Sequence, residues 1–388
     1  MTVSHEMNRT GVDSRGAIVL YLAVVPWYRT ECMHILNRRF GDRVQIVAAA
    51  YALDPTVRTG IPRELYSEVK RRELVGGRFL ATGIKGAVLG ADVCVIDLNP
   101  RSLSAWLVLI VRRLQGARVL VWGHLHPRAG AGARTAALRR FMRRLADGVI
   151  AYDYDGADAA RAEIPTQPVW TAPNALYGSA DMVLDALTKR TSFVYIGRLV
   201  ADKNVDQLVP AFEQSGLWRR GYTLEIVGAG ELADVLAAQL SGLADEVRAS
   251  VTLHGTVTGT AAVRRIYAGA LCALSPGYIG LNATQSLSFG VPILFSRNEP
   301  HAPEIELVRT GAMKAYEDNT IDGLSLAMNV VLEEAESITE TARGQLVEYM
   351  RSFYSAEAMA GGIAAALTES PNTHLSARES GVVDWFEQ

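Results

Sequence analysis

Short apolar segments, each about as long as a β-strand, recur along this chain, and stretches with helical spacing separate them. The first, AIVLYLAVV at residues 17–25, contains no charged residue, as expected for a strand buried on both faces of a sheet. Similar runs follow at residues 44–50, 92–96, 118–122, 149–152 and 168–171. Apolar strands that alternate with helices predict a doubly wound parallel sheet of the α/β class.

A second series begins after a pause near residues 173–175, PNA, and a connecting helix is predicted over residues 179–190. Its strands are expected at residues 193–196, 223–227, 251–254, 271–274 and 292–295. The pattern therefore predicts two Rossmann-like domains that face each other across a cleft. Their predicted bounds are residues 1–176 and 177–370, and residues 371–388 form a tail.

The segment FVYIGRLVADK, residues 193–203, joins a predicted strand to a predicted helix at 205–214. Gly197 allows a sharp turn, and the cations Arg198 and Lys203 follow it. Two cations at the carboxyl end of a parallel strand suit a diphosphate. The alternative is a surface loop with solvated charges, because short motifs recur by accident.

Three segments, GRLVADKN, VGAG and SFGVPIL, resemble the carboxyl-terminal half of a family 4 glycosyltransferase with the GT-B fold. PWYR, NPR and WGH resemble a bacterial branch that commonly builds surface polysaccharides. The similarity runs from about residue 17 to about residue 367. It implies a retaining enzyme that moves a sugar from a nucleoside-diphosphate sugar to a hydroxyl of a glycan, a lipid-linked sugar or a small molecule. In this reading Arg198 and Lys203 hold the diphosphate and act in catalysis.

Polar residues follow three strands of the amino-terminal half, where the ligands of doubly wound sheets bind. The resemblance makes His124 the active-site histidine beside the transferred sugar, with His126 as the competing candidate. Leu125 stands where the family usually has Gly. Without the resemblance, a histidine after a strand is more often a hydrogen-bonded structural residue. The predicted acceptor-binding residues are Tyr28, Arg29, Asn99, Arg101 and His126.

In the carboxyl-terminal half, the resemblance implies a donor site built largely from backbone. Its predicted residues are Gly197, Arg198, Lys203, Gly228, Val257, Gly280, Leu281, Asn282, Ala283 and Gln285. The family usually carries two glutamates at positions that correspond to Gly277 and Gln285, so both carboxylates are absent here. Gln285 can still bond ribose hydroxyls. A helix expected to begin near Thr284 would direct its amino end at the phosphates.

The net charge of −2 conceals two halves of opposite sign. Residues 1–190 hold 26 Lys and Arg against 17 Asp and Glu, whereas residues 191–388 hold 13 against 24. The basic half suggests an anionic partner. No nucleic-acid motif is present, and no aromatic residues alternate with the arginines as stacking platforms would require, so nucleic acid is not an expected partner.

Two helices of the basic half are predicted to differ in exposure. Residues 106–114, WLVLIVRRL, predict a buried helix. Residues 138–145, LRRFMRRL, predict an amphipathic helix with Leu138, Phe141, Met142 and Leu145 inward. Its outer face would carry Arg139, Arg140, Arg143 and Arg144. That face suggests docking on an anionic membrane leaflet or a lipid-diphosphate acceptor, and the alternative is an ordinary solvated face.

Composition suggests a reducing compartment. Cys94 and Cys272 lie in apolar strand-like runs, which points to buried thiols. The first sixteen residues lack the apolar core of a signal peptide, and the longest apolar runs, such as residues 105–111, are too short to span a bilayer. We expect a cytoplasmic protein, and the arginine-rich face of residues 138–145 leaves peripheral contact with the inner face of the membrane open.

The sequence thus predicts a metal-independent glycosyltransferase with no cofactor beyond its nucleotide-sugar co-substrate, since no metal-ligand cluster is evident. Two alternatives stay open. The absent glutamates suggest a non-catalytic nucleotide-sugar-binding protein. A nucleotide-sugar epimerase of the same fold would share the donor half, but it needs acid and base carboxylates that the sequence does not place.

Overall fold

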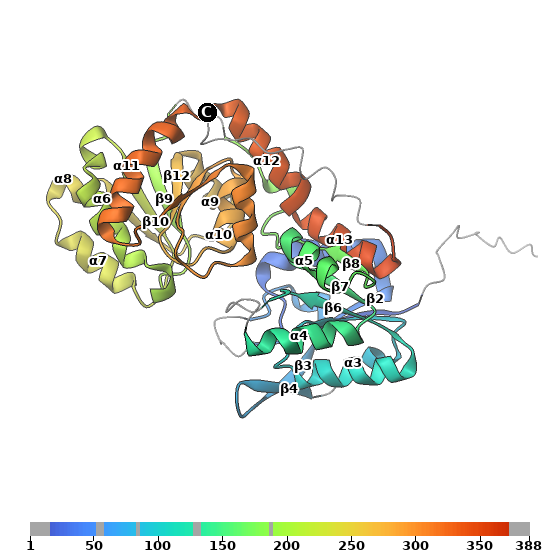
Figure 1. The fold of residues 1–388 in the computed structure, drawn as a ribbon. Helices are drawn as coiled ribbons and strands as arrows, with labels where there is room; N and C mark the ends of the chain where they lie inside the picture. Colours follow the sequence, from blue (N-terminus) through green and yellow to red (C-terminus); the bar gives the residue numbers. More distant parts are fainter. Residues whose placement is uncertain (1–15, 52–57, 83–85, 127–132, 186–188, 372–388) are drawn as a thin grey trace, which may run out of the picture.

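Two parallel sheets, each covered by helices, form two lobes in the computed structural model (Figure 1). The structure describes residues 16–51, 58–82, 86–126, 133–185 and 189–371. None of the described helices is long and apolar enough to span a membrane.

The amino-terminal sheet has eight strands in the order β4-β3-β2-β1-β5-β6-β7-β8. They are β1 (Ile18–Leu22), β2 (Val44–Ala49), β3 (Tyr66–Leu74), β4 (Arg78–Thr82), β5 (Val93–Asp97), β6 (Arg118–Gly123), β7 (Gly148–Ala151) and β8 (Val169–Thr171). Only the β3–β4 pair is antiparallel among the described strands. These two strands were not predicted, because β3 carries the charged sequence YSEVKRREL near the sheet edge and lacks the apolar run of a buried strand.

The carboxyl-terminal sheet has six parallel strands in the order β11-β10-β9-β12-β13-β14. They are β9 (Ser192–Ile196), β10 (Thr223–Val227), β11 (Val251–Gly255), β12 (Ala270–Ser275), β13 (Ile293–Ser296) and β14 (Met313–Tyr316). The first five match the predicted series. Because β9 lies between β10 and β12, its carboxyl end is at the centre of the sheet edge, where ligands of such sheets bind.

Helices connect the strands of both sheets. In the first lobe they are α1 (Thr30–Phe40), α2 (Gly86–Gly90), α3 (Leu103–Gln115), α4 (Arg134–Leu145) and α5 (Tyr154–Glu163). In the second they are α6 (Leu208–Ser215), α7 (Ala233–Ser241), α8 (Asp245–Arg248), α9 (Thr260–Ala268), α10 (Leu281–Ser288), α11 (Ile321–Ser337) and α12 (Glu340–Tyr354). The last helix, α13 (Ala356–Thr368), follows α12 directly.

The connecting helix predicted over residues 179–190 is wrong. Only a 3-10 turn, η4 (Ser179–Asp181), forms, and residues 182–185 are irregular. The Met182 carbonyl accepts a hydrogen bond from Arg351 Nε at 2.8 Å, so α12 takes a carbonyl that a helix would need. Residues 186–188 of the prediction lie outside the described residues.

The end of the chain returns to the first lobe. α13 packs against α1 and β8, and its residues Met359, Ile363 and Leu367 belong to the same core as β1. In Figure 1 α12 and α13 run from the second lobe across to the first. The predicted boundary at residue 370 therefore needs correction, because residues 356–368 complete the amino-terminal core.

The structure also corrects both exposure predictions for the basic half. One face of α3 is exposed, through Leu103, Leu107, Ile110 and Leu114, so the helix is not buried on all sides. In α4, Leu138 and Phe141 face outward, whereas Arg143 is 1% exposed. Arg143 Nη2 lies 3.0 Å from Glu163, a carboxylate of α5, which explains why it can be buried.

Candidate active site

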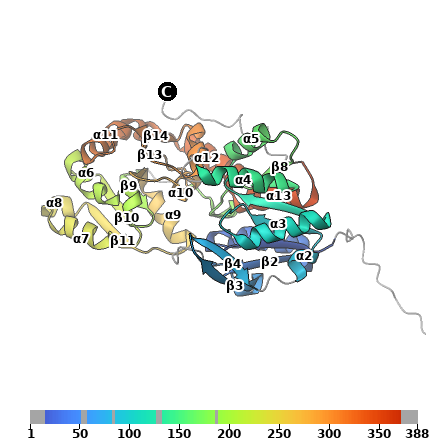
Figure 2. The same cartoon turned by 60° about the horizontal axis from the view of Figure 1, so that its bottom comes forward.

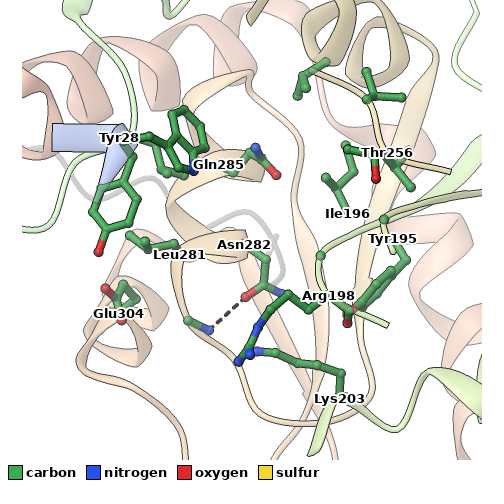
Figure 3. Close-up of a pocket in the computed structure, with 18 of the residues that line it drawn as sticks. Tyr28, Tyr195, Ile196, Arg198, Lys203, Thr256, Leu281, Asn282, Gln285 and Glu304 are labelled. Atoms are coloured by element: carbon green, nitrogen blue, oxygen red, sulfur yellow. Dashed lines mark hydrogen bonds between the residues drawn. The ribbon is translucent and has the colours of Figure 1, made fainter. Parts of the chain in front are cut away.

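A cleft of about 920 Å³ lies between the two lobes, and residues at the carboxyl ends of both sheets line it (Figure 3). From the second lobe come Gly197, Arg198, Lys203, Gly228, Val257, Gly280, Leu281, Asn282 and Gln285. From the first come Trp27, Tyr28 and His124. The geometry thus brings together most of the residues that the sequence singled out.

Gly228 and Gly230 let the turn after β10 pack directly on the turn after β9, which carries Arg198 at the cleft. A Cβ at Gly228 would lie 1.8 Å from the Gly197 carbonyl oxygen, and one at Gly230 would lie 2.2 Å from the Leu199 carbonyl oxygen. Without these side chains, the β10 turn packs directly on the β9 turn, and Leu199 N–H donates to the Ala229 carbonyl at 2.9 Å. The VGAG segment is therefore a support for the β9 turn as well as a wall of the cleft.

The two predicted cations lie side by side. Lys203 ends a 3-10 turn, η5 (Ala201–Lys203); its ammonium donates to the Tyr278 carbonyl and lies 4.5 Å from the centre of the Tyr278 ring. Figure 3 shows the Arg198 guanidinium next to the Lys203 ammonium. Arg198 is exposed and has no ion-pair partner among the described residues. Two neighbouring cations at the cleft wall form a local positive field.

Gly277 lies behind this pair and has no room for a side chain. A Cβ there would lie 2.5 Å from the Lys203 carbonyl carbon and 2.7 Å from the Asp202 carbonyl oxygen. Tyr278 N–H donates to that Asp202 carbonyl at 2.9 Å. A glutamate at position 277 would therefore displace the loop that carries Lys203.

The helix expected near Thr284 begins three residues earlier, because α10 starts at Leu281. Asn282 Oδ1 accepts from Gly280 N–H at 2.8 Å, the bond drawn in Figure 3. The first turn of α10 borders the cleft beside Arg198. Ala283, however, is fully buried and does not line the cleft, so only its backbone is available for the predicted donor site.

The Gln285 amide is held by two tyrosines. Its Nε2 donates to Tyr177 Oη at 2.7 Å, and Tyr267 Oη donates to its Oε1 at 3.3 Å. Each end of the amide retains capacity for one more hydrogen bond. The side chain is thus oriented at the cleft wall rather than left to rotate.

On the opposite wall, His124 follows β6. Its ring packs edge-on against Tyr152, with ring centres 4.7 Å apart. Burial, together with the nearby Arg139 and Arg29, lowers the pKa of His124 to about 4. The imidazole is therefore neutral near pH 7 and acts through hydrogen bonds rather than as a charge.

Behind His124 a second cavity of about 250 Å³ opens into the first lobe. It shares Tyr28 and His124 with the cleft. Its other polar and aromatic lining residues are Arg29, Asp97, Asn99, Trp122, Arg139 and Tyr152. The predicted acceptor residues Arg29 and Asn99 therefore lie in this cavity rather than in the cleft.

Comparisons with known proteins agree with this architecture. Residues 190–334 match the family model described as glycosyl transferases group 1, and no curated protein matches the chain. HepE of Anabaena in complex with UDP has a TM-score of 0.63 at 14% identity, covering 91% of this chain and 100% of that chain. The chain has the GT-B fold. Two more solved structures are similar in fold. The apo lipopolysaccharide outer core galactosyltransferase WaaB has a TM-score of 0.60 at 14% identity, covering 91% of this chain and 99% of that chain. The sucrose-phosphate synthase of Thermosynechococcus elongatus has a TM-score of 0.57 at 15% identity, covering 91% of this chain and 98% of that chain.

Two predicted residues line neither the GT-B cleft nor the cavity behind it. Arg101 is exposed, and its backbone N–H donates to Asn99 Oδ1 at 3.1 Å. His126 Nε2 lies 3.9 Å from Glu163, a carboxylate of α5.

Sequence reasoning missed several residues of the GT-B cleft. Asn174 comes from the pause between the two strand series, and Tyr177 and Tyr278 are further examples. Glu304, in η8 (Pro303–Thr310), is the one acid that lines the cleft among the described residues. Its carboxylate accepts from Asn174 Nδ2 at 3.1 Å, and burial raises its pKa. The signal for Glu304 was its place after β13, at the same sheet edge as Arg198.

The described segments hold no group of three or more His, Cys, Asp or Glu that could bind a metal ion. All three cysteines are buried and unbonded, as predicted for Cys94 and Cys272.

Proposed function

We propose that this chain is a retaining glycosyltransferase that moves a sugar from a nucleoside-diphosphate sugar to a hydroxyl acceptor. The observation that carries the proposal is the pair Arg198 and Lys203, held at the cleft next to the first turn of α10. The match of residues 190–334 to glycosyl transferases group 1 supports it, as do complexes of the neighbour HepE with UDP and with UDP-glucose.

The donor would lie along the second lobe. Its base would contact the backbone near Thr256 and Val257, and its ribose would contact Gln285. Its diphosphate would lie between Arg198, Lys203 and the amino end of α10, which combines fixed cations with a positive helix end. The transferred sugar would then face His124.

In the reaction, the acceptor oxygen bonds to the anomeric carbon as the bond from that carbon to the diphosphate oxygen breaks. The electron pair of the broken bond leaves with the diphosphate, and the acceptor hydroxyl proton passes to the departing phosphate oxygen on the same face. Negative charge grows on the diphosphate, where Arg198 and Lys203 stabilise it. The neutral His124 imidazole would orient the sugar by hydrogen bonding.

We further propose a cytoplasmic enzyme that docks on an anionic membrane leaflet through α3 and α4. Both views show these helices next to each other (Figure 2), and the rings of Trp106 and Phe141 lie 5.9 Å apart. Their exposed side chains are Leu103, Leu107, Ile110, Leu114, Leu138 and Phe141 together with Arg113, Arg140 and Arg144, which we call the α3–α4 face. Apolar residues among cations suit the boundary of an anionic bilayer.

A thermal-shift panel of UDP, GDP, ADP and CDP tests the donor site. At least one should raise the melting temperature, because a ligand that binds only the folded state stabilises it by mass action. Arg198→Ala should abolish the shift, whereas Arg219→Ala should preserve it. The Arg219 guanidinium lies 4.2 Å from the centre of the Trp218 ring, in the turn before β10. This turn is at the amino ends of the strands, the sheet edge opposite the cleft. No shift with any nucleotide would overturn the donor-site assignment.

Turnover then separates the alternatives. A transferase releases the nucleoside diphosphate in proportion to glycosylated acceptor, whereas an epimerase returns an isomerised nucleotide sugar. Nucleotide binding without either product would favour the non-catalytic protein that the absent carboxylate at Gly277 suggests. Activity that survives EDTA would support the metal-independent mechanism.

A further inference from the structure

We propose that the cavity behind His124 binds an anionic group of the acceptor, a carboxylate or a phosphate ester, between Arg29 and Arg139. This inference rests on the proposed transferase function, because an anionic group bound in this cavity would place the acceptor hydroxyl within reach of the transferred sugar. It also assigns a role in the site to Arg139, which the sequence pattern placed on the outer face of an arginine-rich helix.

Arg29 is rigidly held within the first lobe. Its guanidinium lies 4.6 Å from the Trp122 ring centre and 4.8 Å from that of Tyr152, and its Nη2 donates to Asn174 Oδ1 at 3.2 Å. The residue is only 5% exposed. Even so, its Nε has no hydrogen-bond partner among the described residues.

Arg139 enters the same cavity from α4. Its Nη1 donates to the carbonyls of Leu98 at 2.6 Å and His124 at 2.8 Å, so the side chain is fixed at both neighbouring strand ends. Its Nε is also buried without a partner in the described structure. Buried polar groups are normally paired, so an orphaned nitrogen on each of two guanidinium groups points to a ligand.

Two more buried nitrogens at this cavity lack partners among the described residues: Trp122 Nε1 and His124 Nδ1. Guanidinium and indole N–H groups can only donate hydrogen bonds. The lining is therefore rich in donors, and it is complementary to a group rich in acceptors, such as a carboxylate or a phosphate.

The charge balance also favours an anion. Asp97 is the one acid among the described lining residues, and one of its oxygens accepts from Ala23 N–H. Burial raises the pKa of Asp97 to about 6, and His124 is neutral near pH 7. Two guanidinium groups thus face one carboxylate in the cavity lining. Glu304 also acts on Arg29, but it lines the cleft rather than the cavity, and Arg101 adds a further positive charge near Arg139. An uncompensated buried cation is costly, so an anionic ligand would relieve it.

The position of the cavity links it to the reaction. Tyr28 and His124 form a wall common to cavity and cleft, so one molecule can extend from Arg139 to the donor sugar. The cavity volume of about 250 Å³ accommodates an anionic group with part of a sugar ring. The predicted acceptors are therefore uronic acids or phosphorylated sugars rather than neutral ones.

Titration calorimetry with inorganic phosphate, methyl glucuronide and the neutral methyl glucoside tests the proposal. Phosphate or the glucuronide should bind the wild type, and the glucoside should bind more weakly. Arg139→Gln should weaken anion binding about tenfold or more, since it removes a charged hydrogen-bonding group. The exposed Arg38→Gln, a matched arginine of the same lobe paired with Glu31, should bind as the wild type does. Comparing the two anions shows whether carboxylate or phosphate is preferred.

A measurement on the unaltered protein covers the case in which Arg139→Gln fails to fold. The indole N–H resonance of Trp122, assigned by its loss in Trp122→Phe, should shift as phosphate is added. No anion binding, an unmoved indole resonance, or equal binding by a folded Arg139→Gln would overturn the anion site. Binding of UDP, GDP, ADP and CDP is recorded in parallel. If none of them binds while anion binding is intact, the proposed donor function is refuted and the cavity assignment stands.

Discussion

Gly277 and Glu304 together determine from which position an acidic side chain can line the cleft. The backbone of Asp202 and Lys203 occupies the space that a side chain at position 277 would need. Glu304 reaches the cleft from a different element and is fixed by Asn174. Among the described residues that line the cleft, an acid can therefore contact the proposed donor sugar only from the η8 side.

The first prediction concerns the cationic pair. Arg198→Ala and Lys203→Ala should each lower turnover by about two orders of magnitude, as the loss of an electrostatic stabiliser usually does. Steady-state kinetics with the nucleotide sugar identified by the thermal-shift panel measures this. Circular dichroism should show an intact fold for Arg198→Ala, because that side chain is exposed. Near-normal activity in the double variant would contradict the donor-site assignment.

A second prediction concerns Gln285. Gln285→Ala should raise the donor KM, because ribose hydroxyls would lose partners at a cost of about 1–3 kcal/mol. Gln285→Glu should keep or improve donor binding, since a carboxylate can accept from Tyr267 and from the ribose. The control is Gln214→Ala, an exposed glutamine of α6 that pairs with Asp322 and does not line the cleft; it should leave the donor KM unchanged. If neither Gln285 variant alters nucleotide affinity, Gln285 does not contact the ribose.

Sequence reasoning located residues that follow strands directly, because the carboxyl ends of parallel strands meet at one edge. Arg198, His124 and Tyr28 were found in this way. It failed where a residue near the end of the strand itself or a distant helix supplies the group. Asp97 and Trp122 lie within β5 and β6, and Arg139 enters from α4. No local pattern indicates that an arginine of a helix turns inward to two carbonyls.

Among the elements, α4 shows why a hydrophobic pattern can assign the wrong face. The arrangement of Leu138 and Phe141 with Met142 fits an inward apolar stripe, but the helix is rotated so that Arg139 and Arg143 are inward. Both arginines contact groups that are distant in sequence: two strand-end carbonyls for Arg139 and Glu163 for Arg143. Tertiary partners therefore decided the orientation, and they left apolar residues outside.

This orientation changes the membrane prediction. Arg140→Gln combined with Arg144→Gln should reduce sedimentation with phosphatidylglycerol vesicles, and Phe141→Ser should weaken it further. Added salt should also release the protein, because charge attraction is screened within about 8 Å at physiological ionic strength. Arg38→Gln with Arg39→Gln, exposed on α1, serves as the matched control. A wild type that ignores anionic vesicles at low salt would leave the α3–α4 face as an ordinary solvated surface.

At the scale of the whole molecule, η8 joins the two lobes. Glu306 Oε2 accepts from the backbone N–H groups of Tyr154 and Asp155 at 2.9 Å each, at the start of α5, and its Oε1 accepts from Tyr354 Oη at 2.7 Å. Arg309 forms an ion pair with Asp155. The element that carries the cleft acid Glu304 is therefore also a contact between the lobes.

Glu306 predicts a pH dependence of stability. Burial, with repulsion from Asp153, raises its pKa from 4.5 to about 8. The folded state thus binds a proton more tightly than the unfolded state, so this group's contribution to stability falls as pH rises through the window up to about 8. The melting temperature should therefore decline from pH 6.5 to 8.5, and less steeply in Glu306→Gln. Glu348→Gln, an exposed acid of α12 beside Arg351, should retain the wild-type slope. Equal slopes in all three proteins would contradict the assignment.

The return of α13 to the first lobe has a consequence for how the protein is made. During synthesis, residues 18–171 supply all eight strands of the first sheet long before Ala356–Thr368 leave the ribosome. Until then, the surface of α1 and β8 that α13 covers is open to water. The second lobe, by contrast, can complete its sheet once β14 has emerged. The lobe that is translated first should therefore be finished last, and a nascent chain paused before residue 356 should bind chaperones through its amino-terminal half.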